Sequence, residues 1–205
     1  MPRMFQDPVR RPYNQRGSYE GWKWPRDTQD GRVARSEWST AVRYGLGMVE
    51  TSNGSTRFVL KNTDGLKDMF LTTFWKVSER IKDIIEEIDP GRHQFIPIKI
   101  TDKGKSPIAK PNWYILNVME RQESIVDELS KVKPMYGSED TRERMSISPF
   151  NSFVMMNASQ LNRDVHLWRE KRYNIEIFIS DDLAMRLEEI GGKLPFLTVD
   201  FVKIH

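Results

Sequence analysis

Two segments of the chain repeat one pattern of apolar and polar positions. Each opens with a strand-like run that ends in serine, at Ser78 and at Ser180. Aliphatic residues follow three and seven positions later, and a Glu-Glu-Ile triplet occupies positions eight to ten. Positions three, seven and ten lie on one side of a helix, so we predict a buried stripe with the glutamates facing outward. The two stripes are Ile81, Ile85 and Ile88, and Leu183, Leu187 and Ile190.

Both predicted helices have start and stop signals. A serine hydroxyl can accept a hydrogen bond from a free backbone N–H of the first turn, so Ser78 and Ser180 are predicted N-caps. Proline and glycine at 89–91, and the glycine pair at 191–192, end the helices. The chain is therefore predicted to contain two strand-helix-strand units that are structural counterparts, with a chance match of two ordinary capped helices as the alternative. The strands that follow the helices are expected over 95–100 and 196–204.

Strand patterns also occur outside these units. Residues 40–50 and 57–60 are rich in β-formers, and Asn53-Gly54 between them is a strong hairpin signal. Pro97 cannot donate to a strand ladder, so its strand is expected at a sheet edge or with a bulge. A short helix is predicted over 64–74, whereas residues 119–133 fit either a helix or a strand and turn. Further strands are predicted over 113–118, 153–156, 165–168 and 175–179.

The first 35 residues differ in composition from the rest. They carry 8 Lys and Arg against 4 Asp and Glu, and proline and aromatic residues stand between the arginines. Because no helical or strand period is present, we predict an extended arm over 1–35 and a single domain over 36–205. Arginine interleaved with aromatic residues can bind single-stranded nucleic acid. Such a segment can equally lay its aromatic rings on the domain that follows.

Composition limits the classes of protein to consider. The 205 residues are 38% hydrophobic, which is enough to fill a core, and the net charge is +3. Cysteine is absent, which excludes disulfide scaffolds, thiolate metal sites and thiol catalysis. No apolar run reaches the length of a membrane span. We therefore expect a cytoplasmic protein without a membrane partner.

No cluster of residues predicts a catalytic or metal site. His93, His166 and His205 have no further ligand at a metal-binding spacing, so we expect no metal and no cofactor. Paired carboxylates occur at 86–87, 181–182 and 188–189. Neighbours in sequence point apart on a helix, so a solvated face is expected, and an acidic patch for a basic partner is the alternative.

Several linked runs resemble a known family. The run over 75–80 and the run over 90–98 are similar to the eleventh immunity-protein family of bacterial polymorphic toxin systems. The runs over 113–118, 165–169 and 177–190 also resemble this family and follow in the same order as in the family. The resemblance covers about residues 64–202 and leaves 1–60 outside. It implies that the protein is not an enzyme and neutralises a toxin, encoded nearby, by direct stoichiometric binding in the cytoplasm.

These observations predict an α+β fold with an antiparallel or mixed sheet, a few short helices and an extended N-terminal arm. The long charged connection over 136–150 is the predicted toxin-binding loop, because long connections in compact domains are often functional. The predicted binding residues are Arg142, Glu143 and Arg144 of this loop, with Trp22 and Trp24 of the arm. Two alternatives stay open. The first is a nucleic-acid-binding protein that uses the arm, although nucleic acid is the less favoured partner. The second is an enzyme of unknown class.

Overall fold

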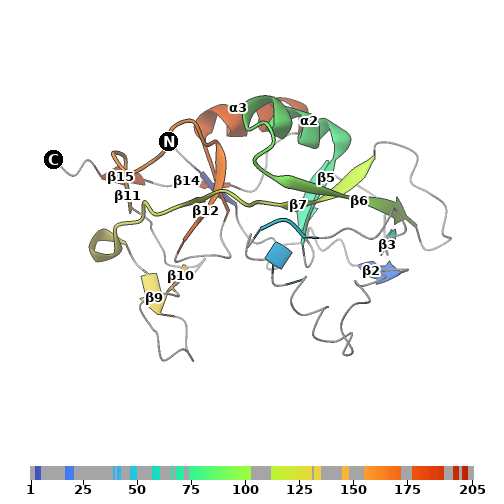
Figure 1. Cartoon of the computed structure of the whole chain (residues 1–205), viewed down its shortest axis with the longest axis horizontal. Helices are drawn as coiled ribbons and strands as arrows, with labels where there is room; N and C mark the ends of the chain where they lie inside the picture. The colour runs from blue at the N-terminus through green and yellow to red at the C-terminus, as the bar shows by residue number, and fades with distance from the viewer. Residues whose placement is uncertain are drawn as a thin grey trace. The chain divides into compact units, whose positions relative to one another are not determined.

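The structure, a computed structural model shown in Figure 1, describes most of the central and C-terminal chain and shorter pieces elsewhere. The described residues are 3–5, 17–20, 39, 41–42, 47–49, 57–60, 66, 68–71, 74–102, 112–130, 132–134, 145–147, 155–171, 177–191, 196–198 and 200–202. They form mixed β-sheets with two α-helices, so the predicted α+β fold is confirmed.

The chain divides into two compact units. Unit 1 consists of Met1–Asp7 and Glu120–His205, and unit 2 consists of Pro8–Met119. Where the sequence predicts an arm over 1–35, the structure has two strands, β1 (Arg3–Phe5) and β2 (Gly17–Glu20). Strand β1 pairs within unit 1 and β2 pairs within unit 2. The N-terminal segment therefore contributes a strand to each unit.

Unit 2 is built on a six-stranded sheet in the order β2-β3-β6-β7-β5-β4. Neighbouring strands are antiparallel, except that β3 and β6 are parallel. The further strands are β3 (Arg57–Leu60), β4 (Met69–Leu71), β5 (Trp75–Ser78), β6 (Gln94–Thr101) and β7 (Trp113–Asn117). Helix α2 (Glu79–Ile88) connects β5 to β6.

The sheet of unit 2 curls around its own core. Strands β3 and β4 stand four places apart in the sheet, about 19 Å in a flat sheet at about 4.8 Å per strand. Yet the rings of Phe58 on β3 and Phe70 on β4 lie only 6.3 Å apart between centroids. The sheet must bend for these side chains to meet. Both rings belong to a core that also contains Leu60, Phe74, Ile96, Ile98, Ile100, Trp113 and Ile115.

Unit 1 is built on a five-stranded sheet in the order β14-β1-β13-β12-β8. Its strands are β8 (Arg121–Gln122), β12 (Leu167–Glu170), β13 (Ile177–Ile179) and β14 (Phe196–Thr198), together with β1. Helix α3 (Asp181–Gly191) connects β13 to β14. Two further pairs complete the unit: β9 (Val132–Pro134) with β10 (Met145–Ile147), and β11 (Met155–Asn157) with β15 (Asp200–Val202); the 3-10 turn η2 is Asp127–Leu129.

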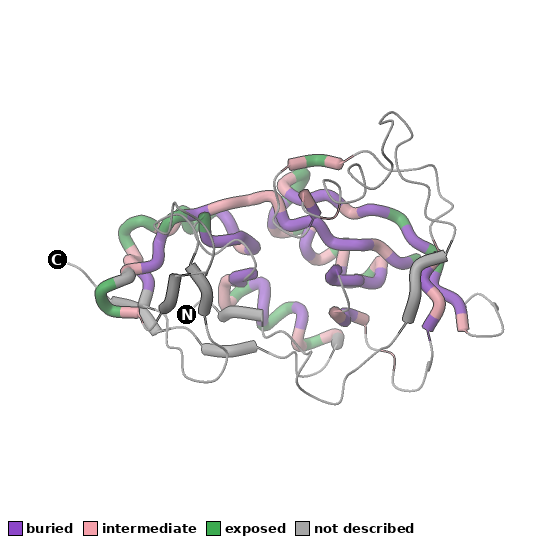
Figure 2. Tube along the Cα trace, turned by 90° about the horizontal axis from the view of Figure 1, so that it is seen from below, coloured by how far each residue is buried: buried purple, intermediate pink, exposed green. Residues whose placement is uncertain are grey.

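Both helices are capped as the sequence predicts. The Oγ of Ser78 accepts a hydrogen bond from the Ile81 N–H, and the Oγ of Ser180 accepts one from the Leu183 N–H. The first two residues of each stripe are buried, and Ile88 and Ile190 are half-buried. Figure 2 shows buried and exposed positions alternating along the helices. Helix α2 ends at Asp89, whose N–H donates to the Ile85 carbonyl, and Gly91 then takes a φ of +67°.

The two strand-helix-strand units are structural counterparts. In unit 2, β7 lies between β5 and β6 and is antiparallel to both; in unit 1, β1 lies between β13 and β14 in the same way. The preceding strand matches too, because Ser78 N–H donates to the Asp68 carbonyl and Ser180 N–H donates to the His166 carbonyl. The N-terminal strand β1 therefore fills in unit 1 the central place that β7 fills in unit 2.

Three sequence predictions are wrong in detail. The helix over 64–74 is contradicted by β4, which pairs with β5, so tertiary pairing overrides the local helical pattern. The single strand over 196–204 is two strands that pair with different partners, β14 with β1 and β15 with β11. The predicted hairpin partner of β3 is replaced by β2 and β6 on its two sides, and Ala41 and Val42 are helical. Asn53 and Gly54 lie outside the described residues.

Other predictions hold in part. Pro97 belongs to an interior strand, but β3 pairs only with residues 99–101 of β6, so Pro97 has a strand neighbour on one side alone. The strands over 113–118, 153–156, 165–168 and 175–179 correspond to β7, β11, β12 and β13. Residues 119–133 contain β8, η2 and the start of β9. Within the predicted loop over 136–150, residues 145–147 form β10, and the others lie outside the described residues.

Replacing the cap serines tests how each helix start is held. Ser78→Ala should lower the free energy of unfolding by about 1 kcal/mol, because one N–H of the first turn loses its acceptor. Ser180→Ala should cost more, since Ser180 Oγ also lies 2.9 Å from Nδ1 of His166. Urea unfolding of both variants, followed by circular dichroism, measures the two losses. Equal losses would contradict a structural role for the His166 contact.

Candidate functional site

Helix α3 has a sharply divided surface. Its inner side is fully buried through Leu183, Ala184 and Leu187. On the opposite side Met185 is 50% exposed. The serine cap and the buried side together fix the rotation of the helix. They therefore hold Met185 on the outer surface.

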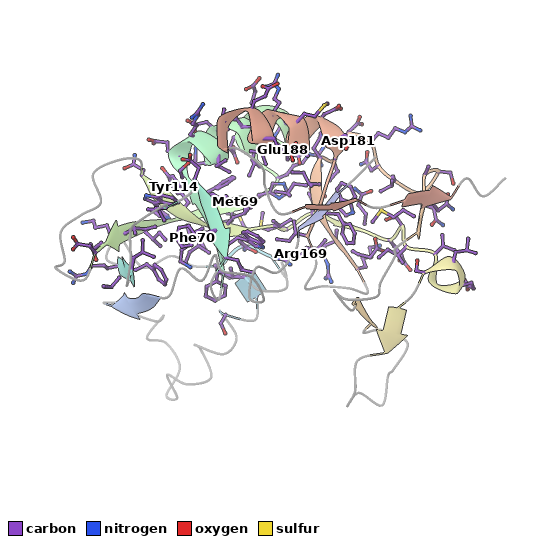
Figure 3. The ribbon with its side chains drawn as sticks, turned by 180° about the vertical axis from the view of Figure 1, so that it is seen from behind. Met69, Phe70, Tyr114, Arg169, Asp181 and Glu188 are labelled. Atoms are coloured by element: carbon purple, nitrogen blue, oxygen red, sulfur yellow. The ribbon has the colours of Figure 1, made fainter. Side chains whose placement is uncertain are left out.

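Four carboxylates lie within about one turn of Met185 on this surface, and the exposed Arg186 follows it directly. Asp181 and Asp182 precede it by four and three residues, and Glu188 and Glu189 follow it by three and four. Residues at these spacings are surface neighbours on a helix. Figure 3 shows Asp181 and Glu188 on α3. We call Asp181, Asp182, Met185, Glu188 and Glu189 the α3 face.

The counterpart helix shows that the exposed methionine is not required by the fold. Met185 stands five residues after its cap serine, and the residue at that place in α2 is Asp83. The glutamate pair is present in both helices, as Glu86-Glu87 and as Glu188-Glu189. A polar residue at this position is therefore compatible with the same capped helix. An apolar side chain inside a polar rim is the composition found at the centre of protein interfaces.

Charge is distributed unequally between the two units. Unit 1 has 13 Lys and Arg against 16 Asp and Glu, a net charge of −3, whereas unit 2 has 19 against 13, a net charge of +6. The net charge of +3 for the whole chain conceals this difference. The α3 face thus belongs to the acidic unit, and it adds four carboxylates to one short surface.

Unit 2 has a second mixed surface beside α2. The rings of Phe95 and Tyr114 meet edge to face with centroids 6.3 Å apart, and Nζ of Lys82 lies 5.8 Å and 5.7 Å from them. Partial burial, and then the Glu79 carboxylate, raise the pKa of the Tyr114 hydroxyl. The rings, the cation and the carboxylate already satisfy one another within the unit.

Another exposed methionine is Met48, which is 76% exposed. Buried amides hold its segment: Gln94 bonds both the N–H and the carbonyl of Val49, and Asn117 Nδ2 donates to the Gly47 carbonyl. Gly47 takes a φ of +133°, where a side chain would be strained. The contacts explain why the segment is held against the sheet, and they indicate no particular partner.

Lys76 is a fully buried cation in the core of unit 2. Its Nζ lies 4.2 Å from the Phe58 ring centroid and 5.5 Å from that of Phe70, and it donates to the Phe74 carbonyl. Burial lowers the pKa of Lys76 well below its ordinary value. In unit 1 the equivalent position is Phe178, which stacks on Trp168 at 6.0 Å. A cation therefore replaces one ring of an aromatic pair.

The remaining buried polar groups join segments of the chain. His93 Nε2 lies 3.4 Å from Asp89 Oδ2 and ties the end of α2 to β6. Glu170 accepts hydrogen bonds from the N–H and hydroxyl of Ser124 and fixes the segment after β8. Within the described part of the chain, no group of three His, Cys, Asp or Glu side chains could hold a metal ion. His205 is not among the described residues.

The binding residues predicted from the sequence cannot be compared with the α3 face. Arg142, Glu143, Arg144, Trp22 and Trp24 all lie outside the described residues. The sequence pattern did contain a signal for α3, namely a methionine on the side opposite the apolar stripe. A solvated face was the favoured interpretation there, because carboxylates alone do not separate a solvated surface from a binding surface.

Comparisons with known proteins connect the chain to one family. Among the described residues, no helix is long and apolar enough to cross a membrane. No curated protein matches the chain. A family model described as an immunity protein family, Imm11, matches residues 8–201, so the match begins well before the resemblance seen over 64–202. Since this match spans nearly the whole of both units, the chain belongs to the immunity protein family Imm11.

Proposed function

We propose that this protein protects a bacterial cell by binding a toxin directly, in a stoichiometric complex, in the cytoplasm. The family match over residues 8–201 carries the proposal, because immunity proteins act against toxins. The α3 face supports binding as the mode of action. It offers an apolar side chain in a polar rim, and methionine is enriched in protein interfaces.

The charged loop predicted from the sequence belongs to the same proposal. We propose that Arg142, Glu143 and Arg144, with Trp22 or Trp24, extend the toxin-binding face. Truncating the arm does not test this, since residues 3–5 and 17–20 are strands of the two units. Alanine substitutions at the tryptophans and at the three loop residues leave β1 and β2 in place.

Growth of a toxin-producing cell tests the proposed function. The toxin gene beside this gene is expressed in a sensitive host, with and without the protein. Growth should be restored only when the protein is present, and variants at the loop or at the tryptophans should protect less than the parent. A host that dies at the same rate with the folded parent protein would contradict the proposed function. Full protection by all loop and tryptophan variants would remove only their assignment to the binding face.

A further inference from the structure

The central place in the sheet of unit 1 is a slot that one strand fills. Strand β1 lies between β13 and β14 and pairs antiparallel with both, so that Met4 stands opposite Phe178 on one side and Leu197 on the other. All three residues of β13 are buried. Without its strand, the slot would expose them and leave two rows of backbone groups unpaired, so it must be filled.

The strand and the walls of this slot come from separate parts of the chain. The walls, β13 and β14, form one continuous segment with α3 over 177–198, whereas β1 belongs to Met1–Asp7. All of Pro8–Met119, which is unit 2, lies between them in the sequence. In unit 2 the central strand β7 follows its neighbour β6 after residues 102–112 alone. The central strand of unit 1 is therefore a separate piece that the chain must bring back to its sheet.

This separation in sequence weakens the preference of the slot for the strand of its own chain. The loop that β1 closes, over 6–176, is about fifteen times longer than the loop over 102–112. In an unfolded chain the probability of closure falls with about the 3/2 power of loop length, so the effective concentration of β1 at its slot is about sixtyfold lower. A strand from another copy makes the same contacts and competes better here than it would in unit 2.

We propose that the slot between β13 and β14 binds the β1 strand of a second copy of this chain, and that two copies exchange these strands in a reciprocal dimer. The pairs of Met4 with Phe178 and with Leu197 then join two chains instead of one. Exchange of an identical element is a low-cost route to a dimer, because no new complementary surface is needed. The inference does not rest on the proposed function.

Strands are exchanged while the chains fold. In the folded protein β1 leaves only by opening a slot whose wall β13 is buried, so exchange between folded copies should be slow. When two chains fold beside each other, the β1 strand of each can enter the slot of the other. The dimer fraction should therefore depend on the protein concentration during refolding, and later dilution should change it slowly.

Engineered cysteines identify the chain that supplies the strand, because the sequence contains no cysteine of its own. Met4→Cys and Leu197→Cys replace direct partners of an antiparallel ladder, whose Cα atoms lie within the range that a disulfide bridges. With both changes in one chain, oxidation after dilute refolding should close a disulfide within the monomer. For exchange, a Met4→Cys chain and a Leu197→Cys chain are unfolded in urea, mixed and refolded together. The control mixture replaces the second chain by Lys99→Cys, an exposed position of β6 in unit 2.

Two refolding concentrations bracket the expected competition. Short flexible links give millimolar effective concentrations, and a value about sixtyfold lower lies between about 10 µM and about 500 µM. Both samples are diluted to one concentration before oxidation, so chance contacts are equal, and peptide mapping by mass spectrometry then detects the link between residues 4 and 197. This link should be about tenfold or more frequent after refolding at the higher concentration, whereas the control should stay at background.

The contrary results are distinct. A disulfide within the double variant, without a cross-chain link above the control, would overturn the inference and leave β1 held by its own chain. A double variant that does not close would show that β1 is not beside β14, and a parent dimer that forms without the 4–197 link would be joined by another surface; each also overturns it. If the cysteine variants do not fold, light scattering of the refolded parent decides, because its dimer fraction must rise with refolding concentration.

Discussion

Met4→Pro is expected to lower the stability of unit 1 by about 3 kcal/mol or more, because β1 is a central strand and each buried backbone group left unpaired costs about 1–3 kcal/mol. Met4 stands opposite Phe178 of β13 on one side and Leu197 of β14 on the other. Proline removes one backbone donor from this ladder and prevents a close fit with both neighbours. Met4→Val, which keeps the N–H and suits a strand, should cost much less.

Hydrogen exchange measured by mass spectrometry follows this effect in each unit separately. In Met4→Pro, peptides from β12, β13 and α3 should exchange faster, while peptides from β5, β6 and β7 should exchange as in the parent. Deleting residues 1–7 should have the same effect in a stronger form. Unchanged protection of β13 in the deletion variant would show that β1 is not the central strand of unit 1.

Lys76→Met is expected to stabilise the protein at neutral pH. Lys76 is completely buried, and its Nζ lies near two aromatic rings and donates to the Phe74 carbonyl. Replacing buried charged pairs by apolar side chains has given gains of up to about 4 kcal/mol, and a gain of at least about 1 kcal/mol is expected here. The counterpart residue Phe178 shows that an apolar side chain suits this position.

The gain from Lys76→Met should depend on pH in one direction. Burial lowers the pKa of Lys76 in the folded protein, whereas the unfolded chain keeps the ordinary value of 10.5. Between these two pKa values the unfolded state binds more protons, so the stability of the parent rises with pH. The advantage of the variant should therefore shrink from about pH 8 towards about pH 10.5. Urea unfolding of both proteins across this range measures it, and an advantage that grew with pH would contradict the burial of Lys76.

Local patterns in the sequence predicted the parts of the fold that depend on neighbouring residues. The stripe after Ser78 and the stripe after Ser180 specify a helix, its buried side and its cap within about ten residues. The repeat of these spacings also indicated that the two strand-helix-strand units are counterparts. These features need no information about distant strands.

Features that depend on distant pairing were missed. Nothing within Arg3–Phe5 shows that it pairs with β13 and β14, which lie near the other end of the chain. The segment that includes Met69–Leu71 has a helical pattern but is a strand because β5 lies beside it. Lys76 interrupts the apolar pattern of β5, and its burial follows only from the curl that brings Phe58 and Phe70 together. Long-range contacts decide each of these cases.

The candidate site was only partly visible in the sequence for the same reason. The sequence allowed two interpretations of the carboxylates beside Ile190, a solvated face or an acidic patch. Choosing between them required knowing that Met185 is exposed. Comparison with Asp83 of α2 makes this exposure informative, since both positions occupy the same place in equivalent helices. The repeat thus turned a common surface pattern into a specific hypothesis.

Inhibition of the purified toxin, measured as the molar ratio of this protein to toxin is increased, tests the central claim most directly. A protein that neutralises the toxin by direct binding should reduce toxin activity linearly and abolish it near equal molar amounts, and the two chains should elute together in size-exclusion chromatography. Complete inhibition at a small fraction of the toxin concentration, without a complex, would show that the protein acts catalytically and would contradict stoichiometric binding.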